Sequence, residues 1–305
     1  MNPLAGLETL VPHCIFGAPA ASCTTFRVGG PAWALCEVQT VGEFRALSTF
    51  AIERHCPVRI VGKGSNLLFG DDGFPGVLVT LGHDFQRITI GQEGLFTAGA
   101  GVSLAKLANT LARAGLGGFE FVAQIPGCVG GSVAVNAGAF GQDLHSRLLS
   151  VRALDLRGLE VELAAAALAG CYRTTALKGH QDLSLIEATF QAVPMDPEVV
   201  LKKQGEYGEY RRRTQPINQA SAGCVFKNPG KGCSAGALID KLGLKGLAVG
   251  DARVSDKHAN FIVNLGKARA RDIVDLIGTV RGRVYTETGI LLEPELELVG
   301  VTLPA

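Results

Sequence analysis

The sequence lacks the features that would place it in several large classes of protein. Its 305 residues carry 29 Lys and Arg against 28 Asp and Glu, so no net field draws it to nucleic acid or to an anionic membrane. No apolar run reaches the roughly 18 residues that span a bilayer. Residues 1–17 also lack the basic start and apolar run of a secretory signal. We therefore expect a cytoplasmic protein with no membrane insertion and no nucleic-acid partner.

Metal-binding and disulfide patterns are missing too. The eight cysteines form no CxxC pair and no Cys/His cluster at zinc spacing. Asp71, Asp72 and Glu120 are not spaced like metal ligands either, so no metal site is expected. Because the chain is long and shows no secretory signal, we expect the cysteines to be thiols, most of them buried.

Two nucleotide-binding signatures are absent, although a related loop is present. Residues 58–62 predict a short buried strand, which continues into KGSNLL. Leu67 occupies the place of the last glycine in GxGxxG, and no GxxxxGK[ST] motif exists, which argues against a dinucleotide-binding fold and a P-loop. The glycines of this loop still offer backbone amides, while Ser65 and Asn66 offer a hydroxyl and a carboxamide. The loop therefore predicts nucleotide binding through the backbone.

Glycine is abundant, and many of the 40 glycines fall in loops, above all in residues 118–141, GFEFVAQIPGCVGGSVAVNAGAFG. Glycine lets backbone N–H groups approach a ligand and tolerates φ > 0, at roughly 0.5–1 kcal/mol of conformational entropy in regular structure. Successive amides in turns form sites for phosphate, and this stretch has no Lys or Arg that would bind one instead. We interpret it as a ligand-binding loop; the alternative is a set of sheet corners.

Apolar periodicity predicts short helices between mostly antiparallel strands. Residues 41–54 and 104–113 repeat apolar side chains at helical spacing, and Ser103 precedes the second helix as an N-cap. The residues expected on the two buried faces are Phe44, Leu47, Phe50 and Ala51, and then Leu104, Leu107, Ala108 and Leu111. Strands are expected at 24–38, interrupted by Gly29, Gly30 and Pro31, and at 76–81, 86–90, 95–98, 149–156, 161–163 and 183–193.

Proline marks a boundary near residue 195. Pro194 and Pro197 flank an acidic residue and break regular structure, after which residues 198–213 predict a charged, exposed helix. A strand, helix and strand unit is expected at 260–264, 270–285 and 296–299, and a short helix in the alanine-rich run from Ala164. We expect an N-terminal segment at 1–21, a lobe at 22–195 with subdomains of about 22–82 and 83–195, and a last domain at 196–305.

Several ordered motifs carry a resemblance to a known family. VGKGSNLL (61–68), AGAGVSL (98–104) and IPGCVGGSVAVNAG (125–138) resemble the flavin-binding loops of the UDP-N-acetylenolpyruvoylglucosamine reductases, the MurB enzymes of peptidoglycan synthesis. The similarity continues through TQP, SAGCVFKNP, KHANFIVN and LEPEL. It implies an α+β fold, with a two-subdomain FAD-binding lobe of the vanillyl-alcohol-oxidase type and a small α/β substrate domain. The chain has no room for the insertion of the longer family members.

The resemblance also implies an activity. Family members use NADPH and non-covalent FAD to reduce UDP-N-acetylglucosamine enolpyruvate to UDP-N-acetylmuramate, with hydride passing from flavin N5 to the vinyl carbon. The flavin supplies the redox chemistry and the protein supplies position. A monomer is expected. The residues implied in FAD binding are Gly62, Lys63, Gly64, Ser65, Asn66, Leu67, Gly99, Gly101, Ile125, Pro126, Gly127, Cys128, Gly130, Gly131, Asn136, Ala137 and Gly138, with Cys128 where the family commonly has threonine.

Three residues are implied in catalysis. Arg173, in a Tyr-Arg pair, offers a permanent cation to the developing enolate. Cys224 stands at the proton donor's position, and an ordinary thiol, with a pKa of about 8.5, is protonated at neutral pH. Glu295, in its protonated form, would donate a hydrogen bond to the enolate. The ordinary alternatives are a solvated arginine, a packed thiol and an acidic strand face that Glu295 shares with Glu293 and Glu297.

The substrate's diphosphate and uridine need binding groups as well. The family pattern implies Tyr172, Arg213, Lys227, Asn228 and His258, whereas we interpret Arg211 and Arg212 as cations that stabilise a helix C-terminus. Two other functions stay open on the residues alone. One is another FAD-dependent oxidase or dehydrogenase of this fold, acting on an alcohol or sugar lactone; the other is a nucleotide-binding module without chemistry.

Overall fold

The computed structural model describes residues 3–155, 158–168, 183–230 and 232–304. Its backbone contacts group the chain into two compact units, between which the chain passes more than once. Unit 1 consists of Met1–Phe16, Ala34–Gly62 and Gly76–Tyr210, and unit 2 of Gly17–Trp33, Lys63–Pro75 and Arg211–Ala305. No helix in the described part of the chain is long and apolar enough to cross a membrane.

The first sheet, which lies mainly in unit 1, has the strand order β1-β2-β5-β3. β1 pairs antiparallel with β2, whereas β3 pairs parallel with β5, and the predicted apolar face of α2 is buried against this sheet. The elements are α1 (Leu7–Leu10), β1 (Cys14–Phe16), β2 (Ala32–Val38), α2 (Val41–Glu53), β3 (Val58–Ile60) and β5 (Phe74–Leu81).

Two predictions for this sheet are wrong in detail. The strand expected from residue 24 begins only at Ala32, after the predicted interruption at residues 29–31. Residues 25 and 26 form a turn instead, and Arg27 has φ 57°, outside the β region. The strand at 58–60 was expected to be buried, yet Val58 is 36% exposed. β3 is an edge strand of its sheet, so one side of it has no neighbouring strand to cover it.

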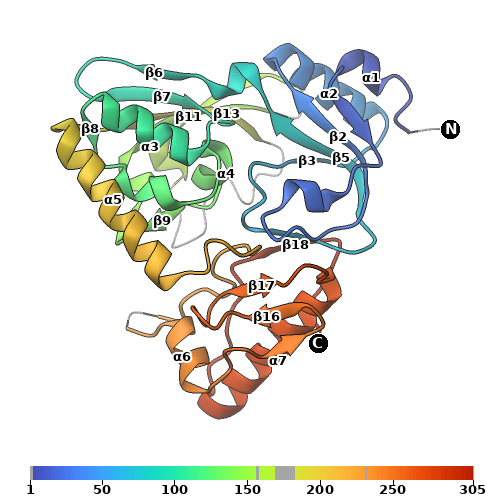
Figure 1. Ribbon diagram of the computed structural model, residues 1–305. Helices are drawn as coiled ribbons and strands as arrows, with labels where there is room; N and C mark the ends of the chain where they lie inside the picture. Colours follow the sequence, from blue (N-terminus) through green and yellow to red (C-terminus); the bar gives the residue numbers. More distant parts are fainter. Residues whose placement is uncertain (1–2, 156–157, 169–182, 231, 305) are drawn as a thin grey trace. The chain divides into compact units, whose positions relative to one another are not determined.

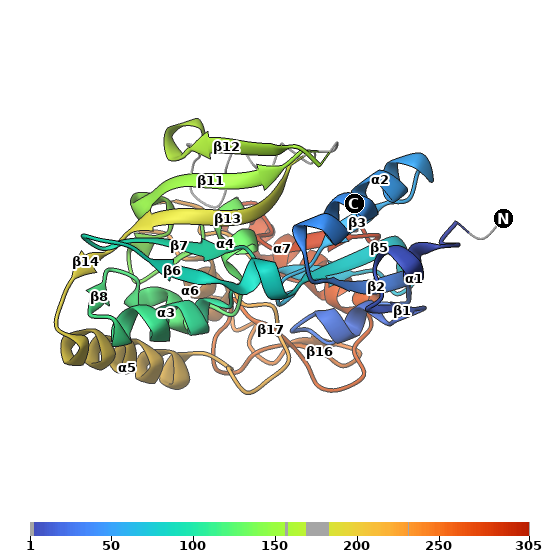
Figure 2. The same cartoon turned by 90° about the horizontal axis from the view of Figure 1, so that it is seen from above.

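A second, antiparallel sheet in unit 1 has the order β12-β11-β13-β7-β6 (Figure 2). The strands predicted at 149–156 and 161–163 correspond to β11 and β12, which pair antiparallel. Rings of Phe96, Phe119 and Phe190 pack together in the core against α3. The elements are β6 (Ile88–Ile90), β7 (Leu95–Gly99), α3 (Leu104–Arg113), α4 (Val129–Ala134), β11 (Leu148–Leu154), β12 (Glu160–Ala164), β13 (Ser184–Gln191) and α5 (Pro197–Thr214).

Short elements complete unit 1. Two-stranded ladders join β8 (Leu116–Gly117) to β14 (Val193–Pro194) and β9 (Gly138–Ala139) to β10 (Gln142–Asp143). The predicted helix in the alanine-rich run is a 3-10 turn at Ala165–Leu168 in the part that is described. The other 3-10 turns among the described residues are Ala20–Cys23, which belongs to unit 2, His83–Gln86, Glu120–Gln124 and His145–Arg147.

Unit 2 packs an antiparallel sheet, β15-β16-β17, against α7 and α6 (Figure 1). A separate parallel pair joins β4 to β18. Helix α7 ends at Gly289, whose φ of 70° is left-handed and marks the C-cap. The elements are β4 (Leu67–Phe69), α6 (Ala235–Lys241), β15 (Ala248–Val249), β16 (Ala252–Val254), β17 (Ile262–Asn264), α7 (Ala270–Thr288) and β18 (Glu297–Val299).

The cysteines depart from the prediction of buried thiols. Cys14 and Cys36 lie opposite each other on β1 and β2 and form a disulfide. The two strands bring residues 22 positions apart into a cross-strand pair, a proximity that no local spacing reveals. Among the free cysteines that the structure describes, Cys56 is buried and the rest are partly exposed.

Candidate active site

Two of the predicted FAD-binding loops lie side by side in unit 1. The N–H of Gly130 donates to the carbonyl of Ala100 at 2.9 Å, and Ser103 and Cys128 form an antiparallel bridge. The third loop begins beside them, since a Cβ placed on Gly62 would lie 3.3 Å from the Cβ of Cys128. The fold therefore gathers glycines from three distant parts of the sequence.

The glycines in these loops have two different causes. A Cβ on Gly99 would lie 2.2 Å from the carbonyl oxygen of Phe85, so protein packing alone demands glycine there. Gly64, with φ 58°, is crowded in the same way by the carbonyl of Cys23. A Cβ on Gly131, in contrast, meets no atom of the described residues within 4 Å. Glycine density thus reflects close backbone packing as well as space that is open to a ligand.

The backbone at residues 62–64 fits a phosphate group. Within the described part of the chain, the N–H groups of Gly62, Lys63 and Gly64 have no hydrogen-bond acceptor, and Gly62 and Lys63 are exposed. Successive free amides in a turn are the donors that bind phosphate oxygens. The residues present therefore fit the diphosphate of FAD.

Two side chains predicted to bind FAD have partners within the protein. The carboxamide oxygen of Asn136 accepts a hydrogen bond from the His145 N–H at 3.0 Å. The Nδ2 of Asn66 donates to the carbonyl of Glu295 at 3.1 Å, and the Asn66 carbonyl accepts from the N–H of Glu297. Asn66 thus ties the flavin loop to the strand segment that carries Glu295.

Backbone hydrogen bonds in unit 2 pair the segment that follows Cys224 with the segment that carries Glu295. The N–H of Glu295 donates to the carbonyl of Val225 at 2.8 Å, and the N–H of Lys227 donates to the carbonyl of Glu293 at 2.9 Å. This register places Glu295 beside the residue that follows Cys224. Glu293, Glu295 and Glu297 alternate along the sequence, so their spacing could not single out Glu295. The backbone pairing with Val225 does.

The candidate diphosphate ligands already have protein partners. The Nζ of Lys227 forms an ion pair with Oε1 of Glu293, and the lysine side chain is only 18% exposed. Asn228 accepts a hydrogen bond from the Ala235 N–H and so satisfies the first turn of α6. Arg213 is exposed in the last turn of α5.

His258 is held in one protonation state by its surroundings. Its Nδ1 accepts a hydrogen bond from the N–H of Asn260 at 3.2 Å, which leaves the proton of the neutral ring on Nε2. Burial lowers the pKa of His258, and the nearby Lys245 lowers it further. The ring is therefore neutral at pH 7.

Comparison with known proteins settles the family. The profile of "UDP-N-acetylenolpyruvoylglucosamine reductase, C-terminal domain" matches residues 215–299, and that of "FAD binding domain" matches residues 32–164. The UDP-N-acetylenolpyruvoylglucosamine reductase of Bacillus pumilus is 36% identical over 294 residues, 96% of each chain. That of a Synechococcus strain is 41% identical over 290 residues, covering 94% of this chain and 93% of its own.

This chain belongs to the UDP-N-acetylenolpyruvoylglucosamine reductase family. The crystal structure of the Thermus caldophilus member has a TM-score of 0.79 and 37% identity, covering 94% of this chain and 98% of that one. The predicted family is thus confirmed, as is the predicted fold of an FAD-binding lobe with a small α/β domain. The protein is an FAD-dependent oxidoreductase.

Sequence reasoning missed one residue of this reductase near the candidate proton donor. Arg211 was interpreted only as a cation at a helix end, but it is half-buried and its Nε donates to Oε1 of Gln215 at 2.6 Å. Burial lowers the pKa of Arg211, while the nearby Cys224 raises it. No sequence signal separates Arg211 from Arg212, because only the fold brings one of them to Cys224.

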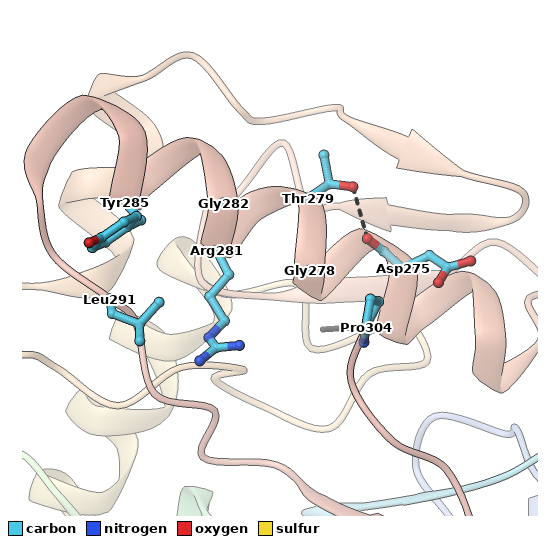
Figure 3. Close-up of a pocket in the computed structure, with 8 residues that line it drawn as sticks. All are labelled: Asp275, Gly278, Thr279, Arg281, Gly282, Tyr285, Leu291 and Pro304. Carbon is cyan, nitrogen blue, oxygen red and sulfur yellow. Dashed lines mark hydrogen bonds between the residues drawn. The ribbon is translucent and has the colours of Figure 1, made fainter.

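Two predicted residues are not described by the structure, and one pocket is separate from the predicted site residues that are described. Tyr172 and Arg173 lie outside the described residues. A pocket of about 580 Å³ lies along α7, with Tyr285 and Leu291 at one end and Pro304 at the other (Figure 3). None of the predicted site residues lines it. Within the described residues, no group of three or more His, Cys, Asp or Glu could hold a metal ion.

Proposed function

We propose that this reductase converts UDP-N-acetylglucosamine enolpyruvate to UDP-N-acetylmuramate, with NADPH as reductant. The observation that carries the proposal is the register in unit 2, which pairs the backbone of Glu295 with that of Val225, the residue that follows Cys224. A proton donor and a second acidic group on two paired segments suit a reaction that builds negative charge on carbon and then quenches it with a proton. The reductase names of the relatives support the same substrate.

Each proposed catalytic residue has one task. FAD held by the loops at residues 62–67, 99–101 and 125–138 would supply the hydride that the vinyl carbon of the substrate receives. Cys224 donates a proton to the carbon beside the substrate carboxylate, and its thiol is left as thiolate. Glu295, protonated, donates a hydrogen bond to the developing enolate, and Arg173 offers it positive charge. Preorganised electrostatic stabilisation of this kind is usually the largest catalytic contribution. Arg211, close to Cys224, favours the thiolate that remains.

The substrate's remaining groups are assigned to other residues. In this proposal Arg213 and Lys227 bind the diphosphate, and Tyr172, Asn228 and His258 contact the rest of the UDP-sugar. The neutral His258 donates through Nε2, since Nδ1 is occupied by the Asn260 N–H. The cytoplasmic location, the monomeric state and the division at residues 22, 83 and 196 remain predictions from the sequence.

A spectroscopic titration tests the overall reaction. We expect the purified holoenzyme to show the flavin absorbance, to bleach anaerobically with NADPH, and to recover its colour with one equivalent of UDP-N-acetylglucosamine enolpyruvate. Recovery with oxygen alone and none with the UDP-sugar would indicate an oxidase. A protein that takes up no FAD would contradict the proposal altogether.

The first specific prediction concerns Cys224. Cys224→Ala is expected to bleach with NADPH at nearly the parental rate, because flavin reduction needs no proton from this thiol. Reoxidation by the UDP-sugar should slow by about 10²- to 10⁴-fold, the usual effect of losing an acid–base group. Stopped-flow absorbance measures each half-reaction separately.

Two variants serve as controls for Cys224. Cys224→Ser should retain more activity than the alanine variant, because a hydroxyl still transfers a proton. Cys233→Ala removes another partly exposed thiol of unit 2 and should leave both half-reactions unchanged. Normal turnover by Cys224→Ala would show that Cys224 is a packed thiol and that the proton has another source.

A further inference from the structure

Asn260 is a buried polar residue, 4% exposed, that the reaction described above does not use. It lies just before β17 and forms three hydrogen bonds with the Cys224 segment. Its carbonyl accepts from the Val225 N–H at 2.9 Å. Its side chain accepts from the Phe226 N–H at 2.9 Å and donates to the Phe226 carbonyl at 2.8 Å.

These bonds complete a two-sided ladder around the Cys224 segment. On one side Val225 and Lys227 bond to the backbone of residues 293–295. On the other side the polar groups of Phe226 face the Asn260 carboxamide. Phe226 is only 2% exposed, so water does not replace these partners. The carboxamide uses one N–H as donor and its oxygen as acceptor, and so makes the same pair of hydrogen bonds that a peptide group of a neighbouring strand would make.

We propose that Asn260 is a positioning residue for the catalytic chemistry: its carboxamide holds the Phe226 peptide groups and thereby fixes the backbone that presents Cys224 on one side and Lys227 on the other. The inference rests on the proposed role of Cys224 as proton donor. Because Cys224 lies two residues from the clamp, a rotation of the Phe226 peptide groups changes the direction of the thiol. A misplacement of about 1 Å is enough to slow a reaction on the order of 10²-fold.

Only a carboxamide of this length satisfies both groups of Phe226. Asn260→Leu keeps a similar volume but leaves a buried N–H and a buried carbonyl without partners. Asn260→Asp is isosteric and keeps the acceptor for the N–H, yet an ionised carboxylate turns a second oxygen toward the Phe226 carbonyl. A protonated carboxyl group restores the missing donor, and burial favours that neutral form.

The test compares the two half-reactions in the holoenzyme. Asn260→Leu is expected to bleach with NADPH at the parental rate and to reoxidise with UDP-N-acetylglucosamine enolpyruvate about 10- to 100-fold more slowly. The matched control is Asn264→Ala. Asn264 is also a buried amide, at the end of β17, and its carboxamide bonds to Phe26, Gly266 and Ala268. Its backbone N–H donates to the carbonyl of Ala220, a bond that the substitution leaves in place. It should leave reoxidation unchanged at equal FAD content.

A second measurement distinguishes positioning from general loss of structure. The reoxidation rate of Asn260→Asp should rise as the pH falls, when compared with the pH profile of the parental enzyme. That parental profile already reflects Cys224 and His258, whose ring accepts a hydrogen bond from the residue 260 N–H. An unchanged profile together with a normal rate for Asn260→Leu would overturn the proposal. So would equal slowing of both half-reactions by Asn260→Leu.

A double-variant cycle separates this inference from the proposed function. If Asn260 acts through Cys224, Asn260→Leu should slow reoxidation far less in a Cys224→Ala background than in the parental enzyme. Fully additive effects would overturn the positioning role while leaving Cys224 as the donor. A Cys224→Ala enzyme that is as fast as the parent would instead overturn the proposed function, and with it the assumption on which this inference rests.

Discussion

At the scale of single residues, Lys227 is a proposed substrate-binding residue whose side chain is held in position by the protein before substrate binds. Its ammonium group is paired with Glu293, whose own side chain is 69% exposed, so the pair opens to solvent on the glutamate side. The backbone N–H of Lys227 is held by the Glu293 carbonyl as well. The ion pair therefore holds the Lys227 ammonium group in position and balances its charge. A positioned ammonium group suits contact with an incoming phosphate.

We predict that Lys227→Ala raises KM for the UDP-sugar by about 10- to 100-fold, the equivalent of one charged hydrogen bond. Its effect on kcat should be much smaller, since the contact is the same in the ground and transition states. Glu293→Gln keeps the ammonium and should leave KM near the parental value. Steady-state kinetics on both variants gives the answer, and equal increases in KM would assign the ion pair a purely structural role.

At the scale of elements, an ion pair joins α5 to the segment that precedes the flavin loop at residues 125–138. Glu120, in the 3-10 turn before Ile125, is fully buried, and its Oε1 accepts from the Gly118 N–H at 3.1 Å. Its Oε2 has no hydrogen-bond partner among the described residues, and Nζ of Lys203 on α5 lies 3.8 Å away. The lysine is therefore a cation that balances this buried carboxylate within unit 1.

Removing that cation should destabilise the fold. Lys203→Met is expected to lower the free energy of unfolding by about 2–3 kcal/mol, because a buried carboxylate without its partner is strongly unfavourable and the 39% exposure of Lys203 moderates the loss. Urea titration followed by circular dichroism measures it. The control, Lys202→Met, changes an exposed lysine of the same helix and should have little effect. Adding Glu120→Gln to Lys203→Met should recover part of the stability; no recovery would mean that the lysine acts by packing.

At the scale of the whole molecule, the mode of FAD binding decides how the cofactor is lost. The loops at residues 62–66 and 99–103 contain no His or Cys, and Cys128 is the one thiol in the loop at 125–138. We predict that acid or heat denaturation releases all of the flavin into the supernatant, and that the precipitated chain has its unmodified mass. Flavin that stays with the chain, with the mass increase mapped to Cys128, would contradict non-covalent binding.

Much of the local structure could be predicted from the sequence because local forces determine it. The buried faces of α2 and α3 follow from apolar side chains at helical spacing, and Ser103 caps α3 by accepting from the Lys106 N–H. The antiparallel pair of β11 and β12 follows from two short, strand-forming sequence segments that are joined by a turn. The motifs of the flavin loops were equally readable, because ordered short patterns in one chain identify a family.

The tertiary structure alone decided which residues meet. Cys14 pairs with Cys36, Glu295 and not Glu293 lies beside Val225, and Arg211 lies near Cys224. The Asn260 carboxamide forms hydrogen bonds with the backbone of Phe226, which is 34 residues away in the sequence. Each of these is a contact between segments far apart in sequence. Their register is set by the packing of whole strands and helices, and no propensity of the residues themselves encodes it.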